Sequence, residues 1–177
     1  MGIIARQGLL NTLIIYSGFI LGYVNVVLLM PKFFDSGEIG ARETIVSYAL
    51  IVSQIGAFGL GSSYTKFFYK YRKLMKNGLF ESFILLAIVS FFVTAVIFGL
   101  ISPFIKNTLI QNAPISYRYF DLIFVLSFFY VINSLFEAQL RNLFITSLPI
   151  FLREFLQRLI STLLIFLFAT GLITFSD

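Results

Sequence analysis

The sequence predicts an all-α membrane protein, a bundle of about five transmembrane helices, and three observations support this fold class. Hydrophobic residues make up 59% of the 177 residues, whereas soluble domains contain roughly 45–50%. They gather in five long stretches between short polar segments, and a spanning helix needs about 20 mostly apolar residues. Runs such as Phe83–Val89 and Leu163–Ala169 lack the alternation of apolar and polar residues typical of a membrane β-barrel.

The five predicted helices cover residues 7–31, 42–62, 79–105, 119–141 and 148–175. The first is the clearest, because Gly8–Met30 contains no charged residue. Pro31 and Pro103 lie near predicted helix ends, while Pro149 lies in a first turn and Pro114 in a loop. We therefore expect no proline in a helix interior, where it is most destabilising. We expect residues 1–177 to form a single transmembrane bundle.

Basic residues are distributed unevenly between the two ends of the predicted helices. Nine of the 13 Lys and Arg residues lie on the side of the N-terminus: Arg6, Lys66, Lys70, Arg72, Lys73, Lys76, Arg141, Arg153 and Arg158. The other side carries Lys32, Arg42, Lys106 and Arg118. Cytoplasmic segments of membrane proteins are enriched in Lys and Arg, so we expect the N-terminus in the cytoplasm.

The segment Lys66–Lys76, KFFYKYRKLMK, interleaves basic and aromatic residues. Such a pattern also occurs in nucleic-acid-binding proteins. Its position between two predicted spanning helices instead favours a helix at the membrane surface, with aromatic rings at headgroup depth and lysines near anionic lipid. We expect membrane lipids as partners, and no nucleic acid.

The first predicted helix has a face of small and polar residues. Gly18, Gly22 and Asn25 share this face with Gln7 and Asn11, because their spacings are close to whole turns. Two glycines four residues apart allow another helix to approach closely. Asn25 then has two interpretations, a hydrogen bond across a packing seam or a position in the wall of an aqueous cavity.

The second predicted helix has a similar face. Ala57 and Gly61 lie four residues apart on a stripe of small residues, and Gln54 contributes a polar side chain. Stripes of this kind fit helix packing and also the wall of a shared pathway. Gly56, Gly59 and Gly61 crowd one half of this helix, and glycine is tolerated in membrane helices where neighbours pack tightly or where the helix must bend.

Charged residues flank the loop between the fourth and fifth predicted helices. Glu137 and Arg141 are four residues apart, as are Glu154 and Arg158, so each pair can interact along its own helix. Arg153 has no partner at that spacing. We expect Arg153 and Arg158 in the membrane interface, and two interpretations stay open: anchoring ion pairs, or a cationic entrance for a phosphorylated headgroup.

The composition excludes several kinds of chemistry. The chain has no Cys and no His, so disulfides, thiol chemistry and the usual metal ligands are absent. We find no paired acids, nucleophile–base pair or phosphate-binding glycine loop. We therefore expect neither an enzyme nor a metal or cofactor site.

A series of short motifs runs along the whole chain. They are, in order, Gln7-Gly8, Asn11-Thr12, Gly18, Gly22, Asn25, Pro31, Glu38-Ile39-Gly40, Gly59-Leu60-Gly61, Lys66-Phe67-Phe68, Phe136-Glu137, Phe151-Leu152-Arg153-Glu154 and Arg158. This order resembles the N-terminal part of bacterial polysaccharide flippases of the O-antigen exporter type, which belong to the multidrug/oligosaccharidyl-lipid/polysaccharide superfamily.

The resemblance implies two helical lobes around a central cavity. It also implies export of an oligosaccharide linked to polyprenyl pyrophosphate across the inner membrane by alternating access, for polysaccharide or O-antigen biosynthesis. Asn25 and Gln54 would then face the cavity, and Arg153 and Arg158 would lie near the cytoplasmic entrance. Five helices correspond to an incomplete N-terminal lobe, so transport would need a C-terminal half or a partner subunit.

Two alternatives remain open from the sequence. A multidrug or cation exporter of the same superfamily would favour a carboxylate deep in the membrane, whereas Glu43 and Glu137 both lie near predicted helix ends. A small multi-pass assembly subunit would not transport, and its small-residue faces would dock other helices.

Overall fold

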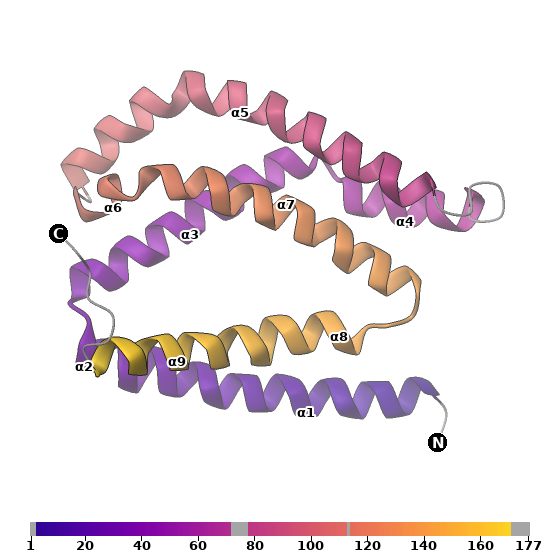
Figure 1. Ribbon diagram of the computed structural model, residues 1–177, viewed down its shortest axis with the longest axis horizontal. Helices are drawn as coiled ribbons and strands as arrows, with labels where there is room; N and C mark the ends of the chain where they lie inside the picture. Colours follow the sequence, from indigo (N-terminus) through magenta and orange to yellow (C-terminus); the bar gives the residue numbers. More distant parts are fainter. Residues whose placement is uncertain (1–2, 72–77, 113, 171–177) are drawn as a thin grey trace. The chain divides into compact units, whose positions relative to one another are not determined.

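The computed structural model describes residues 3–71, 78–112 and 114–170, and the regular structure in these ranges is helical (Figure 1). The elements are α1 (Ile3–Tyr23), η1 (Val24–Leu29), α2 (Met30–Phe33), α3 (Ser36–Ala57), α4 (Leu60–Tyr71), α5 (Gly78–Asn112), α6 (Pro114–Arg118), α7 (Phe120–Asn142), α8 (Ser147–Ile150), η2 (Phe151–Leu156) and α9 (Gln157–Ala169), where η denotes a π-helix.

Four helical stretches of the described residues are long and apolar enough to cross a membrane. They are Arg6–Phe33, Ser36–Tyr71, Gly78–Gln111 and Phe120–Asn142. The helical structure and these four stretches are consistent with an all-α membrane protein. Length and composition give neither the identity of the membrane nor the side on which the N-terminus lies.

The predicted fifth helix, 148–175, is not one of these four stretches. Residues 147–169 are continuously helical through α8, η2 and α9, but the first half of this stretch carries Arg153, Glu154 and Arg158. Charged side chains make a segment less apolar. The end of the predicted helix, residues 171–177, lies outside the described residues.

The prediction that no proline lies in a helix interior is wrong for Pro103. This residue is inside α5, which continues to Asn112 rather than ending at residue 105. The more polar segment after residue 105 continues α5. It can do so because a helix satisfies its own backbone hydrogen bonds in lipid and in water alike. Figure 1 shows α5 as a curved helix, and a proline removes one backbone hydrogen bond from the interior.

The predicted second helix is divided by a short break between α3 and α4. Phe58 and Gly59 have positive φ angles of 42° and 68°. Glycine adopts this conformation without steric cost, as the glycine pattern anticipated for a bend. Beyond the break α4 continues to Tyr71, and residues 72–77 of the basic segment lie outside the described part of the chain.

The chain divides into two compact units, and each is described by itself. One unit is Met1–Ser36 with Phe144–Asp177, and the other is Gly37–Leu143. The single bundle over residues 1–177 stays a prediction.

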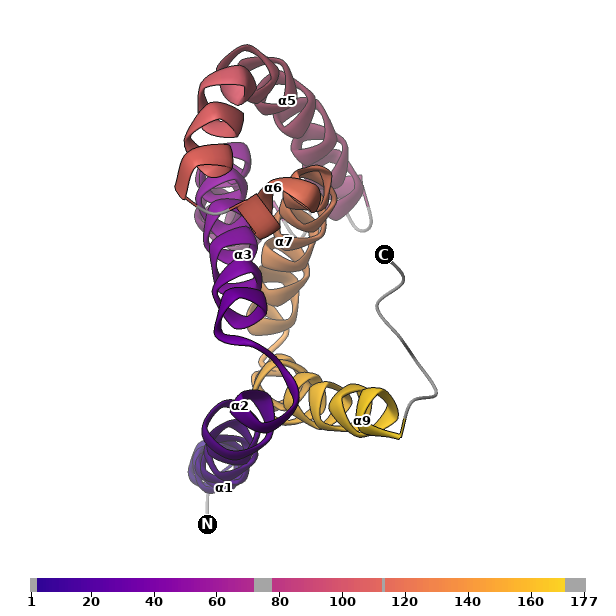
Figure 2. The same ribbon diagram turned by 90° about the vertical axis from the view of Figure 1, so that its left-hand side faces the viewer.

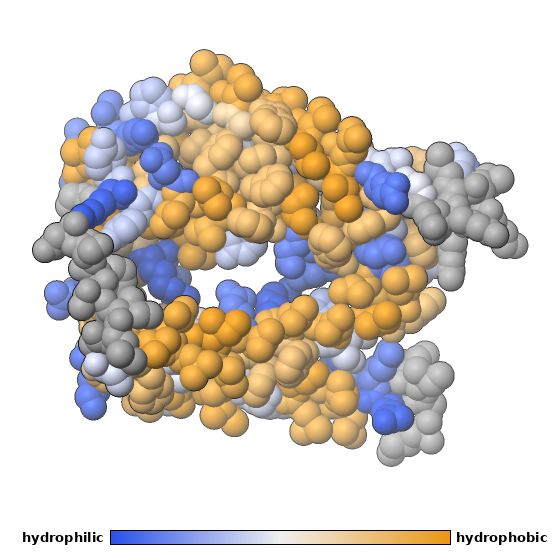
Figure 3. Space-filling model, viewed as in Figure 1, coloured by the Kyte–Doolittle hydropathy of each residue, from blue (hydrophilic) through white to orange (hydrophobic). Residues whose placement is uncertain are grey.

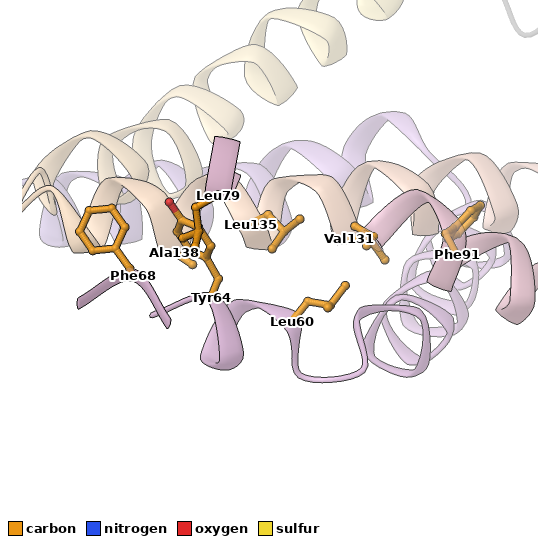
Figure 4. Packing of buried hydrophobic residues seen from close by; sticks show 9 residues of the cluster. Leu60, Tyr64, Phe68, Leu79, Phe91, Val131, Leu135 and Ala138 are labelled. Carbon is orange, nitrogen blue, oxygen red and sulfur yellow. The ribbon is translucent and has the colours of Figure 1, made fainter. Parts of the chain in front are cut away.

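The core of the Gly37–Leu143 unit contains many aromatic rings. Tyr64 is 1% exposed, and its ring lies 5.7 Å from that of Phe80 and 5.2 Å from that of Phe83. Figure 4 shows the buried side chains where α4 and α5 meet α7. The Tyr64 hydroxyl donates a hydrogen bond to Gln139, so the one polar atom of this ring is satisfied inside the core.

A second cluster joins the other halves of α5 and α7 to α3 (Figure 2). Its buried members are Ile45, Ala49, Val52, Phe98, Leu109, Phe120 and Ile123. The rings of Phe98 and Phe120 are stacked with their centroids 5.7 Å apart. The two clusters give α5 and α7 apolar contacts along most of their length.

In the other unit, α1, η1 and α2 run beside α8, η2 and α9 in the same direction (Figure 1). Near one end, Gln7 Nε2 donates to the carbonyl oxygen of Phe144 at 3.1 Å. At the other end, the rings of Phe34 and Phe168 are stacked with centroids 4.9 Å apart. Residue numbers rise together along the two stretches, so the two stretches are parallel and matched in length.

Exposed apolar side chains cover much of the surface. Leu100 and Phe104 on α5 are 79% and 76% exposed, and Figure 3 shows apolar residues over most of the visible surface of α5, α1 and α9. Large contiguous apolar surfaces are rare on soluble monomers. Lipid is the environment that such a surface fits.

We expect Gly59→Ala to destabilise the protein by about 1–2 kcal/mol, because a side chain at φ +68° is strained. No atom lies within 4 Å of the added Cβ, so the effect comes from the backbone alone. Gly99→Ala is the matched control: it adds a Cβ in equally open space inside α5, where alanine is favoured by about 1 kcal/mol. Thermal unfolding in detergent measures both, and shifts of the same sign would contradict the left-handed break.

Candidate functional site

A polar cluster lies inside the unit formed by residues 1–36 and 144–177, where α1 and η1 pack against η2 and α9. We name it the Arg158 cluster, and its members are Gly18, Gly22, Asn25, Glu154, Arg158 and Thr162. The first three come from the polar face predicted for the first helix. Their partners lie more than 130 residues later in the chain.

Gly18 and Gly22 make the close approach possible. A Cβ on Gly18 would overlap the backbone carbonyl of Glu154, and a Cβ on Gly22 would overlap the guanidinium of Arg158. Any larger residue at either position must therefore displace η2 or the Arg158 side chain. The structure thus puts both glycines in a helix–helix contact, with a charged side chain lying over one of them.

Arg158 joins the two stretches through its guanidinium. Nη1 donates to the carbonyl oxygen of Gly18 at 2.9 Å, and Nη2 donates to Glu154 Oε2 at 3.0 Å. The side chains of Arg158 and Glu154 are 35% and 22% exposed. The ion pair predicted from the four-residue spacing is confirmed, and its cation has a second partner on α1.

Arg153 pairs with its neighbour in the sequence and not with a residue at the four-residue spacing. Its Nε donates to Glu154 Oε1 at 3.1 Å, because the long side chain reaches the carboxylate of the next residue. Spacing rules consider only neighbours one helical turn away and miss such a contact. The Glu154 carboxylate therefore lies between two guanidinium groups, and the three side chains carry a formal charge of +1.

Asn25 is 3% exposed and uses both ends of its amide within the protein. Nδ2 donates to the carbonyl oxygen of Arg158 at 2.9 Å, and Oδ1 accepts a hydrogen bond from Thr162 Oγ1 at 2.8 Å. Of the two interpretations left open by the sequence, this geometry is that of a hydrogen bond across a packing seam.

Two π-helices flank the Arg158 cluster. Asn25 lies in η1, where the N–H of Met30 bonds to the carbonyl of Asn25, five residues earlier in the chain. Glu154 lies in η2, which ends with an equivalent bond from Gln157 to Leu152. A π-helix widens the turn and occurs often at functional sites. Sequence reasoning missed both, because neither VNVVLL nor FLREFL has a composition that signals a π-helix.

The Arg158 guanidinium lies level with the middle of the apolar stretch of α1. At 1.5 Å per residue, Gly18 is about 18 Å from Arg6 and about 22 Å from Phe33, the two ends of that candidate span. The sequence expectation put Arg158 in the membrane interface. That expectation stays a prediction, and the parallel pairing of the two stretches places Arg158 beside Gly18.

Three other predicted site residues belong to the Gly37–Leu143 unit. Gln54 on α3 and Arg141 in the last turn of α7 are exposed. Glu137 is half-buried and accepts a hydrogen bond from Asn133 at 3.2 Å.

The structure therefore brings Asn25 and Arg158 together directly and Arg153 through Glu154, while Gln54, Glu137 and Arg141 lie in the other unit.

The small residues of the second predicted stripe pack inside the Gly37–Leu143 unit. Ala57 lies against the aromatic core, and a Cβ on Gly61 would meet the Ser134 carbonyl at 3.6 Å, an ordinary contact. Sequence reasoning gave less weight to Gly56, which makes the closer contact. Its carbonyl accepts a hydrogen bond from Ser90 Oγ at 2.6 Å.

Comparisons of the chain with family models, with curated proteins and with solved structures found no match. The resemblance of its motifs to polysaccharide flippases stays a prediction.

We expect Gly18→Ala and Gly22→Ala to destabilise the protein by about 1–3 kcal/mol, the usual range for overpacking. Gly8→Ala is the matched control on α1, because no atom lies within 4 Å of its added Cβ. Thermal unfolding in detergent gives all three values.

The two glycines should differ when Arg158 is shortened to alanine. The atoms that obstruct residue 22 belong to the Arg158 side chain, whereas those that obstruct residue 18 are mainly the backbone of Glu154. We therefore expect Gly22→Ala to be less costly in the Arg158→Ala background and Gly18→Ala to be equally costly in both. Equal behaviour of the two glycines would contradict the placement of the guanidinium over Gly22.

Proposed function

We propose that this chain is part of a transporter that moves an oligosaccharide linked to polyprenyl pyrophosphate across the bacterial inner membrane. The observation that carries the proposal is the cationic group formed by Arg153, Glu154 and Arg158 on a helix packed against α1. Ionisable side chains at membrane depth are costly and usually functional. The order of motifs that resembles polysaccharide flippases supports the same class of substrate.

The charge of this group fits a phosphorylated headgroup. Two guanidinium groups face one carboxylate, so the three side chains carry a formal charge of +1, the sign that attracts an anion. Guanidinium is planar, carries five N–H donors and binds phosphate through paired hydrogen bonds. Arg158 donates one hydrogen bond from each terminal nitrogen to the protein, so its donor capacity exceeds these two contacts.

The proposal includes a fifth membrane crossing by residues 147–169 with the N-terminus in the cytoplasm. With five crossings the first and fifth helices must run in the same direction, and the stretch from α8 to α9 runs parallel to α1 over its length. The excess of basic residues on the N-terminal side supports the orientation. Export by this scheme needs a second lobe, either a C-terminal half or a partner subunit.

The two alternatives fit the Arg158 cluster less well. A drug or cation exporter needs a carboxylate that can accept a cation, but Glu154 already accepts hydrogen bonds from two arginines. An assembly subunit would present Gly18 and Gly22 to another protein, but this chain's own Glu154 and Arg158 cover them. Both observations favour an anionic substrate.

In the transporter that includes the second lobe, we expect Arg153→Ala combined with Arg158→Ala to reduce glycolipid export at least tenfold, because hydrogen bonds to charged groups contribute about 1.5–3 kcal/mol each and 1.4 kcal/mol is tenfold. Arg42→Ala combined with Arg118→Ala removes the same charge from exposed positions and is the matched control. Export is measured by the appearance of labelled glycan on the outer face of the membrane, and the amount of inserted protein by immunoblot. Normal export by the Arg153 and Arg158 double variant would overturn the proposed site.

A further inference from the structure

We infer that Asn25 is a positioning residue for Arg158 and does not itself bind the transported lipid. The inference rests on the proposed function, because it assumes that the Arg158 guanidinium meets the lipid pyrophosphate. It departs from the sequence expectation, in which Asn25 was one of the residues facing the substrate.

The Asn25 amide is hydrogen-bonded at both its nitrogen and its oxygen and is buried. An amide group offers two N–H donors and one oxygen. Asn25 donates to the Arg158 carbonyl and accepts from Thr162, and its surface is almost entirely covered since it is only 3% exposed. A substrate could reach this amide only if α1 and α9 separated.

These hydrogen bonds also fix the backbone of residue 158, from which the Arg158 side chain extends. The Arg158 carbonyl accepts from Asn25 Nδ2 at 2.9 Å and from Thr162 Oγ1 at 2.9 Å. Thr162 Oγ1 also lies 2.8 Å from Asn25 Oδ1, and its single hydroxyl proton is shared between these two acceptors. Asn25 Nδ2 is therefore the donor that joins η1 to the Arg158 carbonyl across the helix contact. The base of the Arg158 side chain is therefore tied to η1 at one defined height.

The first helical stretch also holds the guanidinium end of the Arg158 side chain. Nη1 bonds to the Gly18 carbonyl, and the guanidinium passes over Gly22, where a Cβ would block it. Asn25 and Gly18 thus hold the backbone and the guanidinium of one arginine from two points on one face of the first helical stretch. A cation held at both ends loses less entropy when it binds an anion.

A double-mutant cycle on ligand affinity tests the inference. The ligand is undecaprenyl pyrophosphate, titrated into the chain in lipid nanodiscs. We expect Asn25→Ala to weaken binding about tenfold when Arg158 is present, a coupling of ordinary size, and less than twofold in the Arg158→Ala background, where Arg153 supplies the remaining affinity. Equal weakening in both backgrounds would mean that Asn25 contacts the ligand, and it would overturn the inference.

Thermal stability supplies the readout that separates positioning from a purely structural role. The bond from Asn25 goes to the backbone of residue 158, so Asn25→Ala should lower Tm equally in the wild-type and Arg158→Ala backgrounds. A positioning residue gives additive changes in Tm and non-additive changes in affinity. A loss of Tm with unchanged affinity in both backgrounds would make Asn25 structural only. Asn11→Ala removes an amide from the same face of α1 without touching Arg158 and should leave affinity unchanged.

A measurement without ligand distinguishes failure of the inference from failure of the proposed function. In protein labelled with ¹⁵N-arginine, the Arg158 guanidinium signal is identified by its loss in Arg158→Lys. We expect Asn25→Ala to shift that signal and Asn11→Ala to leave it in place. If the wild-type chain binds no pyrophosphate lipid, the proposed function is wrong, and an unmoved Arg158 signal in Asn25→Ala overturns the positioning role by itself.

Discussion

The need to satisfy every polar group within the protein constrains this structure more than any other factor. Lipid offers no hydrogen-bond partners, so apolar stretches must be helical, and hydroxyl groups must bond to nearby carbonyls. Thr12, Thr44, Ser82, Thr94 and Ser127 each donate to the carbonyl four residues earlier. The same rule explains why the Arg158 guanidinium donates to the helix carbonyl of Gly18 and does not lie against an apolar neighbour.

Glycine serves two separate purposes under this constraint. At Gly59 the benefit is conformational, since a positive φ ends α3 and starts α4 in a new direction. At Gly18 and Gly22 the benefit is space, since the backbone of Glu154 and the guanidinium of Arg158 occupy the volume that a Cβ would need. The carbonyl of Gly18 is reachable because the glycine has no side chain to cover it, so the small residues provide an acceptor for the half-buried Arg158 guanidinium.

Apolar stretches with sharp polar boundaries were predictable from the sequence, and long-range contacts were not. The helix predicted at 119–141 is Phe120–Asn142 in the structure, because polar residues bound its apolar run on both sides. The end of α5 was missed, since the helix continues for a further two turns through a mixed polar and apolar segment, residues 106–112. Hydropathy marks the preferred solvent of a segment and does not mark where its backbone hydrogen bonds end.

The candidate site was predictable in its residues and not in its arrangement. Spacing was sufficient for the Glu154–Arg158 pair, which is local to one helix. The contact of Asn25 with Arg158 joins residues 133 positions apart, and only the packing of the two stretches determines it. The π-helices changed the register on both sides of that contact, so a regular helical spacing could not have aligned Asn25 with residue 158.

The parallel pairing of the first and last helical stretches has a consequence for biosynthesis. Asn25 leaves the ribosome 133 residues before Arg158, and synthesis at about 5–20 residues per second makes that interval roughly 7–27 s. Throughout it, the amide of Asn25 and the bare carbonyl of Gly18 are without their native partners. The polar face of the first helix is therefore covered by its native partner only after the stretch from α8 to α9 has been synthesised.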